Sequence, residues 1–268
     1  MAPSAIDPTY KAILLDIEGT TTSIAFVKQV LFPYAADTID KFLAANLASD
    51  ADIASAIHDL TTLSNELATH DPQIVPVNAK IVKRACENGL DRETLASLTG
   101  NIRTWIAQDK KLTPLKKLQG IMWEKAYVEG LIKGHVFSDV PPTLSHWRSQ
   151  HIPIFIFSSG SVHAQKLLFQ YSDHGDLTAY LNGYFDTNMG AKTESESYRK
   201  IASEIGIAPN EILFITDMEK EAIAAAAADF RIALSVRDGN APLDAEAYAK
   251  FPVIHSFAEI PAPESNDN

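Results

Sequence analysis

The sequence predicts an α/β protein whose core is a doubly wound, Rossmann-like parallel sheet, with an all-helical cap domain inserted into it. Three observations lead to this prediction. A short apolar run, Ala12–Leu15, has the length and composition of a buried strand. The block that follows it, 23–133, shows apolar residues at helical spacing and no convincing strand. After Gly134, strand-like and helix-like segments alternate, which is typical of parallel strands joined by covering helices.

The opening strand lies far in sequence from the rest of its sheet. We therefore expect a core domain made of residues 1–22 and 134–268, and a helical cap domain made of residues 23–133. Pro33 lies inside a helical pattern and should end or kink that helix. The other strands are expected at these positions: 152–157, 184–185, 212–215, 231–236 and 253–254.

Composition excludes several classes of partner. The chain has 268 residues, enough for one large domain or two modest ones, and its net charge is −11. Nucleic acids and anionic membranes attract clustered Lys and Arg, so neither is an expected partner. An acidic protein can still bind a small phosphorylated metabolite if a metal, a lysine or helix N-termini offset the overall charge locally.

Cysteine content and the N-terminus bear on the compartment. The single Cys86 excludes an intramolecular disulfide, which suits a reducing environment. We see no basic stretch followed by a long apolar region, and no window apolar enough to span a bilayer. The expected location is cytoplasmic, or also nuclear.

The first strand ends in two carboxylates, Asp16 and Glu18. Residues two apart on a strand point the same way, so these acids would repel each other unless a cation lies between them or one is protonated. Gly19 can adopt backbone conformations closed to other residues and therefore suits a tight turn there. A bare Asp-x-Glu is more often a solvated acidic turn, so the case depends on its partners further along the chain.

Polar groups also follow the later strands. Each alone has an ordinary interpretation: the serines as a strand-to-helix turn, the lysine as a solvated side chain, and the late aspartate as a helix cap, with Glu219 and Glu221 favouring the same helix dipole. Ligands of such sheets bind outside the carboxyl ends of the strands. We therefore expect the following residues to meet at one edge of the sheet: Asp16, Glu18, Ser158, Ser159, Lys192 and Asp217.

Together these groups predict a phosphoryl-transfer site. A carboxylate can attack phosphorus and form an aspartyl phosphate, once Mg²⁺ bridges Asp16, Asp217 and the phosphate through oxygen ligands. Serine hydroxyls and helix-start N–H groups can hold phosphate oxygens. A lysine offsets transition-state charge, and a second acid can protonate the leaving oxygen and then activate water.

This order of motifs resembles the haloacid dehalogenase superfamily, whose opening motif is D-x-D-x-T. Here Glu18 replaces the second Asp. With this replacement the sequence resembles one branch of the superfamily, the acireductone synthases of methionine salvage, also called enolase-phosphatases. The resemblance covers nearly the whole chain and rests on these runs: 15–22, 24–28, 31–34, 118–120, 158–162, 165–169, 185–187 and 194–202.

The resemblance implies a monomeric enzyme with one Mg²⁺ per chain and two activities in one site. Its substrate would be 2,3-diketo-5-methylthiopentyl-1-phosphate, first enolised and then dephosphorylated. Asp16, Glu18 (through its main-chain carbonyl) and Asp217 would hold the metal, with Asp16 and Glu18 also catalytic. The remaining residues, Ser158 with Ser159 and Lys192, would bind substrate.

Alternatives stay open at this point. The nearest is a Mg²⁺-dependent phosphatase of the same fold acting on another small phosphate ester. A dehalogenase would need neither the metal nor Asp217. A binding module with a degenerate phosphate pocket is a third. A serine hydrolase is set aside because the chain has no G-x-S-x-G motif. The base for enolisation is not identified.

Overall fold

The computed structural model describes residues 5–79 and 92–263. Contacts divide the chain into two compact units, one made of Met1–Val27 and Lys133–Asn268 and the other of Lys28–Ile132. The first division falls after Val27, whereas the sequence placed the start of the cap at Ser23. The short helix α1 (Ile24–Phe26) stays with the core unit because its Phe26 ring lies 6.3 Å from that of His135. Cys86 lies outside the described residues.

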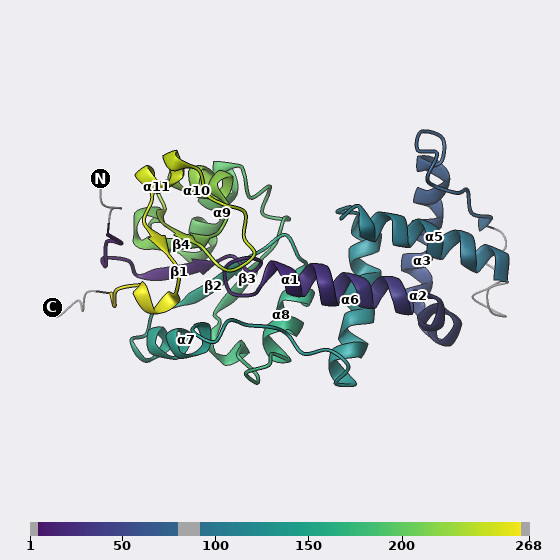
Figure 1. Ribbon diagram of the computed structural model, residues 1–268, viewed down its shortest axis with the longest axis horizontal. Helices are drawn as coiled ribbons and strands as arrows, with labels where there is room; N and C mark the ends of the chain where they lie inside the picture. The colour runs from purple at the N-terminus through teal and green to yellow at the C-terminus, as the bar shows by residue number, and fades with distance from the viewer. Residues whose placement is uncertain (1–4, 80–91, 264–268) are drawn as a thin grey trace. The chain divides into compact units, whose positions relative to one another are not determined.

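The core unit contains a six-stranded sheet in the order β3-β2-β1-β4-β5-β6, and every neighbouring pair is parallel. The strands are β1 (Ala12–Leu15), β2 (Ile154–Phe157), β3 (Gly183–Phe185), β4 (Ile212–Thr216), β5 (Arg231–Ser235) and β6 (Val253–Ile254). In Figure 1, purple β1 lies among the teal and green strands from the second half of the chain. The predicted doubly wound fold is confirmed, with β1 at the point where the strand order changes direction.

Helices cover both faces of this sheet (Figure 1). Ala12 and Leu14 pack in one apolar cluster with residues of α9, α10 and α11. Side chains alternate along a strand, so Ile13 and Leu15, which are also fully buried, face the opposite side. The helices that cover the two faces are α7 (Val140–Ser149), α8 (Val162–Gln170), α9 (Ser195–Ile205), α10 (Glu219–Ala226) and α11 (Ala245–Lys250). Short 3-10 turns lie at Thr178–Tyr180, Pro209–Glu211 and Phe257–Glu259.

In the described part of the second unit, the regular elements are all helices, joined by turns and irregular segments such as residues 71–78. Its helices are α2 (Phe32–Asn46), α3 (Ala51–Leu67), α5 (Arg92–Ala107) and α6 (Thr113–Val128). Their apolar faces meet in one core that includes Ile39, Leu60 and Leu118, all fully buried, and Trp105, which is 1% exposed. A core of this size explains why the insertion forms a compact unit of its own.

Pro33 does not end the helix, but the winding of the helix changes just before it. Helical residues continue from Ile24 to Asn46, but Val27–Leu31 form a π-helical segment immediately before Pro33. Pro33 then lies in the first turn of α2, where a missing N–H is tolerated. The indole N–H of Trp123 donates to the carbonyl of Leu31 at 3.0 Å. Within the described ranges, no helix has the length and apolarity that a membrane span requires.

Candidate active site

The loop after β1, residues 16–22, is called the β1 loop below. The carbonyl of Ile17 accepts hydrogen bonds from the N–H groups of Thr20, Thr21 and Thr22, at 3.2, 2.9 and 2.9 Å, which closes a compact turn. Gly19 has a φ of +78°, a conformation that L side chains rarely adopt. The tight turn predicted at Gly19 is therefore present, with Asp16 buried at its start and Glu18 half-buried within it.

Asp217 lies directly against this turn. A Cβ atom on Gly19 would fall 2.3 Å from Asp217 Oδ2, so any side chain at that position would displace the Asp217 carboxylate. The sheet register explains the approach, because Leu15 pairs with Ile215 and the N–H of Asp16 donates to the Ile215 carbonyl at 2.9 Å. Asp16 and Asp217, 201 positions apart in the chain, therefore emerge from neighbouring strand ends.

Lys192 reaches the same place from the loop after β3. Its Nζ donates to Asp16 Oδ1 at 2.6 Å and lies 2.7 Å from Glu221 Oε2, with 9% of the side chain exposed. Tyr198, on α9, donates its hydroxyl to the Lys192 carbonyl at 2.7 Å, and its ring is buried against Phe157. The Tyr198 hydrogen bond thus fixes the backbone from which Lys192 extends.

Sequence reasoning missed Glu221 as a member of the site, since it was assigned only to the helix dipole. Its carboxylate accepts a hydrogen bond from Thr216 Oγ1 at 2.9 Å in addition to its ion pair with Lys192. Thr216 Oγ1 also lies 3.4 Å from Asp16 Oδ2. The available signal was its position, because Glu221 lies in the first turn of the helix that begins directly after Asp217 and Met218.

The two serines lie at the end of β2. Ile156 pairs with Leu15, so Ser158 stands level with the start of the β1 loop. Ser158 is 8% exposed, and its Oγ accepts a hydrogen bond from the N–H of Gly160 at 3.3 Å. Ser159 is half-buried. Asp16, Lys192 and Asp217 are thus brought into one cluster, and the serines share their edge of the sheet.

Burial and like charges perturb the acids of this cluster. Burial, together with the negative charges of Asp16 and Glu221, raises the pKa of Asp217 to about 8. Burial and the charge of Asp16 likewise raise the pKa of Glu221 to about 7, against the opposing effect of Lys192. Burial alone would lower the pKa of Lys192, but the carboxylates of Asp16 and Glu221 outweigh it and raise that pKa.

The charge balance of the cluster favours a cation. Three carboxylates, those of Asp16, Asp217 and Glu221, surround the single ammonium group of Lys192. The described residues contain no group of three or more His, Cys, Asp or Glu side chains arranged to hold a metal. A metal here would therefore need main-chain oxygen as well as the carboxylates of Asp16 and Asp217. Such an all-oxygen donor set suits a hard divalent cation.

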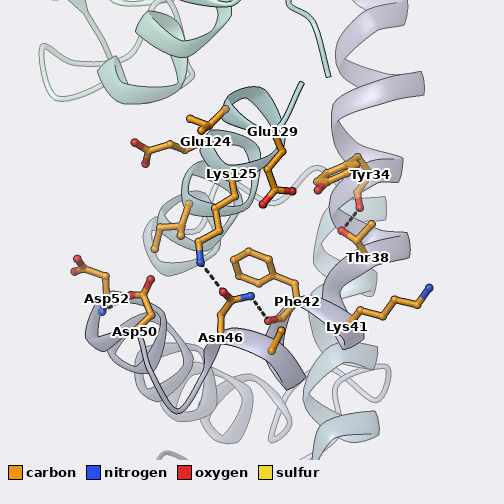
Figure 2. Close-up of a pocket in the computed structure, with 13 residues that line it drawn as sticks. Tyr34, Thr38, Lys41, Phe42, Asn46, Asp50, Asp52, Glu124, Lys125 and Glu129 are labelled. Atoms are coloured by element: carbon orange, nitrogen blue, oxygen red, sulfur yellow. Dashed lines mark hydrogen bonds between the residues drawn. The ribbon is translucent and has the colours of Figure 1, made fainter. Parts of the chain in front are cut away.

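The helical unit carries a pocket of its own, with a volume of about 780 Å³, between α2, α6 and the start of α3 (Figure 2). Lys125 extends over it, 5.5 Å from the centre of the Phe42 ring, and donates to Asn46 Oδ1 at 2.5 Å (Figure 2). None of the residues expected at the active site lines this pocket.

Comparison with known proteins agrees with the geometry of the core unit. The sequence model for haloacid dehalogenase-like hydrolases matches residues 10–229. Proteins named enolase-phosphatase E1 from Caenorhabditis briggsae and Caenorhabditis elegans are each 47% identical over 251 residues, or 94% of this chain and 96% and 97% of theirs. The counterpart from Xenopus tropicalis is 43% identical over 98% of this chain and 99% of its own.

Solved structures show the same fold. A crystal structure of the UTR4 protein from Saccharomyces cerevisiae is 33% identical, covers 93% of this chain and 99% of its own, and superposes with a TM-score of 0.69. CbbY from Rhodobacter sphaeroides, solved with phosphate, is only 15% identical with a TM-score of 0.55, and supports the fold alone. The chain belongs to the enolase-phosphatase E1 family of haloacid dehalogenase-like hydrolases.

Proposed function

We propose that this protein is the acireductone synthase of methionine salvage, a phosphoric monoester hydrolase with an enolase activity in the same site. It converts 2,3-diketo-5-methylthiopentyl-1-phosphate to 1,2-dihydroxy-3-keto-5-methylthiopentene, the acireductone, and phosphate. The observation that carries the proposal is identity of up to 47% with proteins named enolase-phosphatase E1 across more than nine-tenths of both chains. The cluster of Asp16, Lys192 and Asp217 agrees with the phosphatase half of this activity.

The proposed cofactor is one Mg²⁺ per chain, held by the carboxylates of Asp16 and Asp217 and the main-chain carbonyl of Glu18. The residues present fit such an ion because the buried cluster has more carboxylates than cations. When bound, Mg²⁺ supplies positive charge that offsets the carboxylates and the substrate phosphate and polarises substrate oxygens.

The side chains have distinct roles in phosphate release. Asp16 attacks phosphorus, and the P–O bond to the leaving enol oxygen breaks as the aspartyl phosphate forms. Glu18 donates a proton to that oxygen and then takes one from the water that hydrolyses the aspartyl phosphate. Lys192, 2.6 Å from Asp16 Oδ1, orients the nucleophile and offsets charge on the transferring group.

Substrate binding is proposed for Ser158, Ser159 and Lys192. Both serines lie at the carboxyl end of β2, where the N-terminus of α8 begins after the cap residue Ser161. Hydroxyl groups and helix-start N–H groups are suited to phosphate oxygens. We further propose that a single chain forms the complete site and that it acts on a small molecule in the cytoplasm.

The test is product analysis with the diketone phosphate in the presence and absence of Mg²⁺, measuring acireductone and inorganic phosphate in the same reaction. We expect both products in equal amounts, and no phosphate release in excess chelator. Phosphate release from a panel of other small esters, without turnover of the diketone, would replace this proposal with a phosphatase of the same fold. Full activity in chelator would favour dehalogenase-type chemistry.

A further inference from the structure

The β1 loop is held in place by hydrogen bonds from residues that have no role in the catalytic steps proposed above. Three consecutive carbonyl groups of this loop accept hydrogen bonds from outside it. The Gly19 carbonyl accepts from Asn240 Nδ2 at 2.9 Å, the Thr20 carbonyl from Arg237 Nε at 3.3 Å, and the Thr21 carbonyl from the N–H of Phe137 at 3.0 Å. Two of the three donors are side chains of one short segment, 237–240, which follows β5.

Arg237 is itself fixed from several sides. Its side chain is 6% exposed, and Nη1 donates to Asp139 Oδ2 at 2.9 Å and to the His255 carbonyl at 3.1 Å. The guanidinium carbon lies 4.6 Å from the centre of the Phe137 ring and 5.1 Å from that of Phe257. A cation held between aromatic rings and a carboxylate has little freedom, so its Nε is preorganised for the β1 loop.

Asn240 lies on the other side of the turn, against Gly19 and Asp217. Its Nδ2 donates to Gly19 and also contacts the Ser235 carbonyl at 3.3 Å, which ties the amide to the end of β5. Its Oδ1 lies 3.1 Å from the point where a Cβ on Gly19 would be, and Asp217 Oδ2 lies 2.3 Å from that same point. The Asn240 amide thus packs against the turn at Gly19, where the turn also contacts Asp217.

We propose that Arg237 and Asn240 are positioning residues of this active site. By holding the carbonyl groups of Thr20 and Gly19, they fix the β1 loop, and with it Asp16 and the Glu18 carbonyl, against Asp217. The proposal rests on the proposed function for its kinetic consequence, but the geometric part stands independently of the substrate. Misplacement of reacting groups by an ångström can cost two orders of magnitude in rate.

The test compares Asn240→Ala with Asp238→Ala, an exposed residue of the same segment. Three quantities are measured: amide hydrogen exchange of residues 16–22 in metal-free protein, the dissociation constant for Mg²⁺ alone, and the kinetics of phosphate release from the diketone phosphate. For Asn240→Ala we expect faster exchange, Mg²⁺ affinity weakened at least about fivefold, kcat lowered at least about tenfold and KM nearly unchanged. Asp238→Ala should match the wild type in all three.

Arg237→Lys tests the second donor, with the midpoint of thermal unfolding measured beside it. Lysine keeps a positive charge near Asp139 but lacks the guanidinium Nε that donates to the Thr20 carbonyl, so exchange of the β1 loop and kcat should change as in Asn240→Ala. Wild-type exchange and Mg²⁺ affinity in Asn240→Ala would overturn the proposal. If the wild type does not turn over the diketone phosphate, the proposed function fails, and exchange and Mg²⁺ titration still decide the positioning role.

Discussion

Replacing Asp217 with asparagine should stabilise the metal-free protein, even though it removes a proposed metal ligand. Asp217 is 8% exposed, and burial together with the charges of Asp16 and Glu221 raises its pKa to about 8. In an unfolded chain the same group titrates near 3.8. At pH 7 the metal-free protein must therefore take up a proton at Asp217 when it folds, which opposes folding.

The magnitude follows from these two values. The unfolded carboxyl group titrates about three pH units below pH 7, and each unit corresponds to about 1.4 kcal/mol, so the cost of folding is about 4 kcal/mol. Asparagine is neutral in both states and similar in size to the protonated acid, so Asp217→Asn avoids this cost. Because the folded pKa is raised, the stabilisation of the variant is absent near pH 4 and grows as the pH rises towards 8.

The assay is urea denaturation of the wild type and Asp217→Asn in excess chelator, at several values between about pH 5 and pH 8. Asp238→Asn is the control, because it removes an exposed acid near the same loop and should change stability little at any pH. Added Mg²⁺ should then stabilise the wild type and have little effect on Asp217→Asn. A variant less stable than the wild type at pH 7 to 8 in chelator would refute the reasoning, as would a gain that does not change with pH.

Three further changes test separate parts of the molecule. Asp16→Asn should abolish phosphate release but spare enolisation, because only the second step uses Asp16 as a nucleophile; separate measurement of the two steps checks this, and equal loss of both would contradict separable roles. Tyr198→Phe keeps the ring packing but loses the hydrogen bond to the Lys192 carbonyl, so kcat should fall about fivefold, the equivalent of about 1 kcal/mol, at a nearly unchanged unfolding temperature; unchanged kcat in steady-state kinetics would count against the role of Tyr198. Trp105→Ala, in the core of the helical unit, should lower the free energy of unfolding by about 3–5 kcal/mol in urea denaturation, and a loss below about 1 kcal/mol would be inconsistent with full burial.

The strands were predictable because buried strands appear in the sequence as short runs of apolar residues. β1 is buried at all four positions, which produces a continuous apolar segment rather than an alternating one. β2 begins at Ile154, two residues later than predicted, since Pro153 has no N–H to contribute to the sheet. Helix α11, only six residues long, was not predicted because a single short turn of alanines and polar residues carries no clear periodicity.

The π-helical segment before Pro33 could not be predicted from the sequence. A proline indicates that one helical hydrogen bond is missing, but not how the chain accommodates the loss. Here the widened turn lies upstream, and Trp123 donates to the Leu31 carbonyl from 92 positions away. That contact exists only once α2 and α6 have packed together, so no local pattern contains it.

The site residues also fall into two groups, those that the sequence predicts and those that only the packed fold shows. Asp16, Lys192 and Asp217 were predictable because strand ends of a parallel sheet converge on one edge, whatever the intervening sequence. Glu221 and Asn240 were not, because each has a more common local interpretation, as a helix-dipole acid and as a turn residue. Only the packed fold shows that one meets Lys192 and the other meets Gly19.

The electrostatics of the site connect folding to the proposed catalysis. Lys192 neutralises one of the three neighbouring carboxylates, and burial together with the remaining negative charge raises the pKa of Asp217 and of Glu221. A divalent cation would offset that charge, so its binding free energy also contributes to the stability of the folded state. The same excess of carboxylates that destabilises the metal-free protein thus attracts the ion. A variant that relieves the repulsion should therefore gain stability and lose metal affinity together, a trade-off expected of sites whose charges are arranged for chemistry rather than for folding.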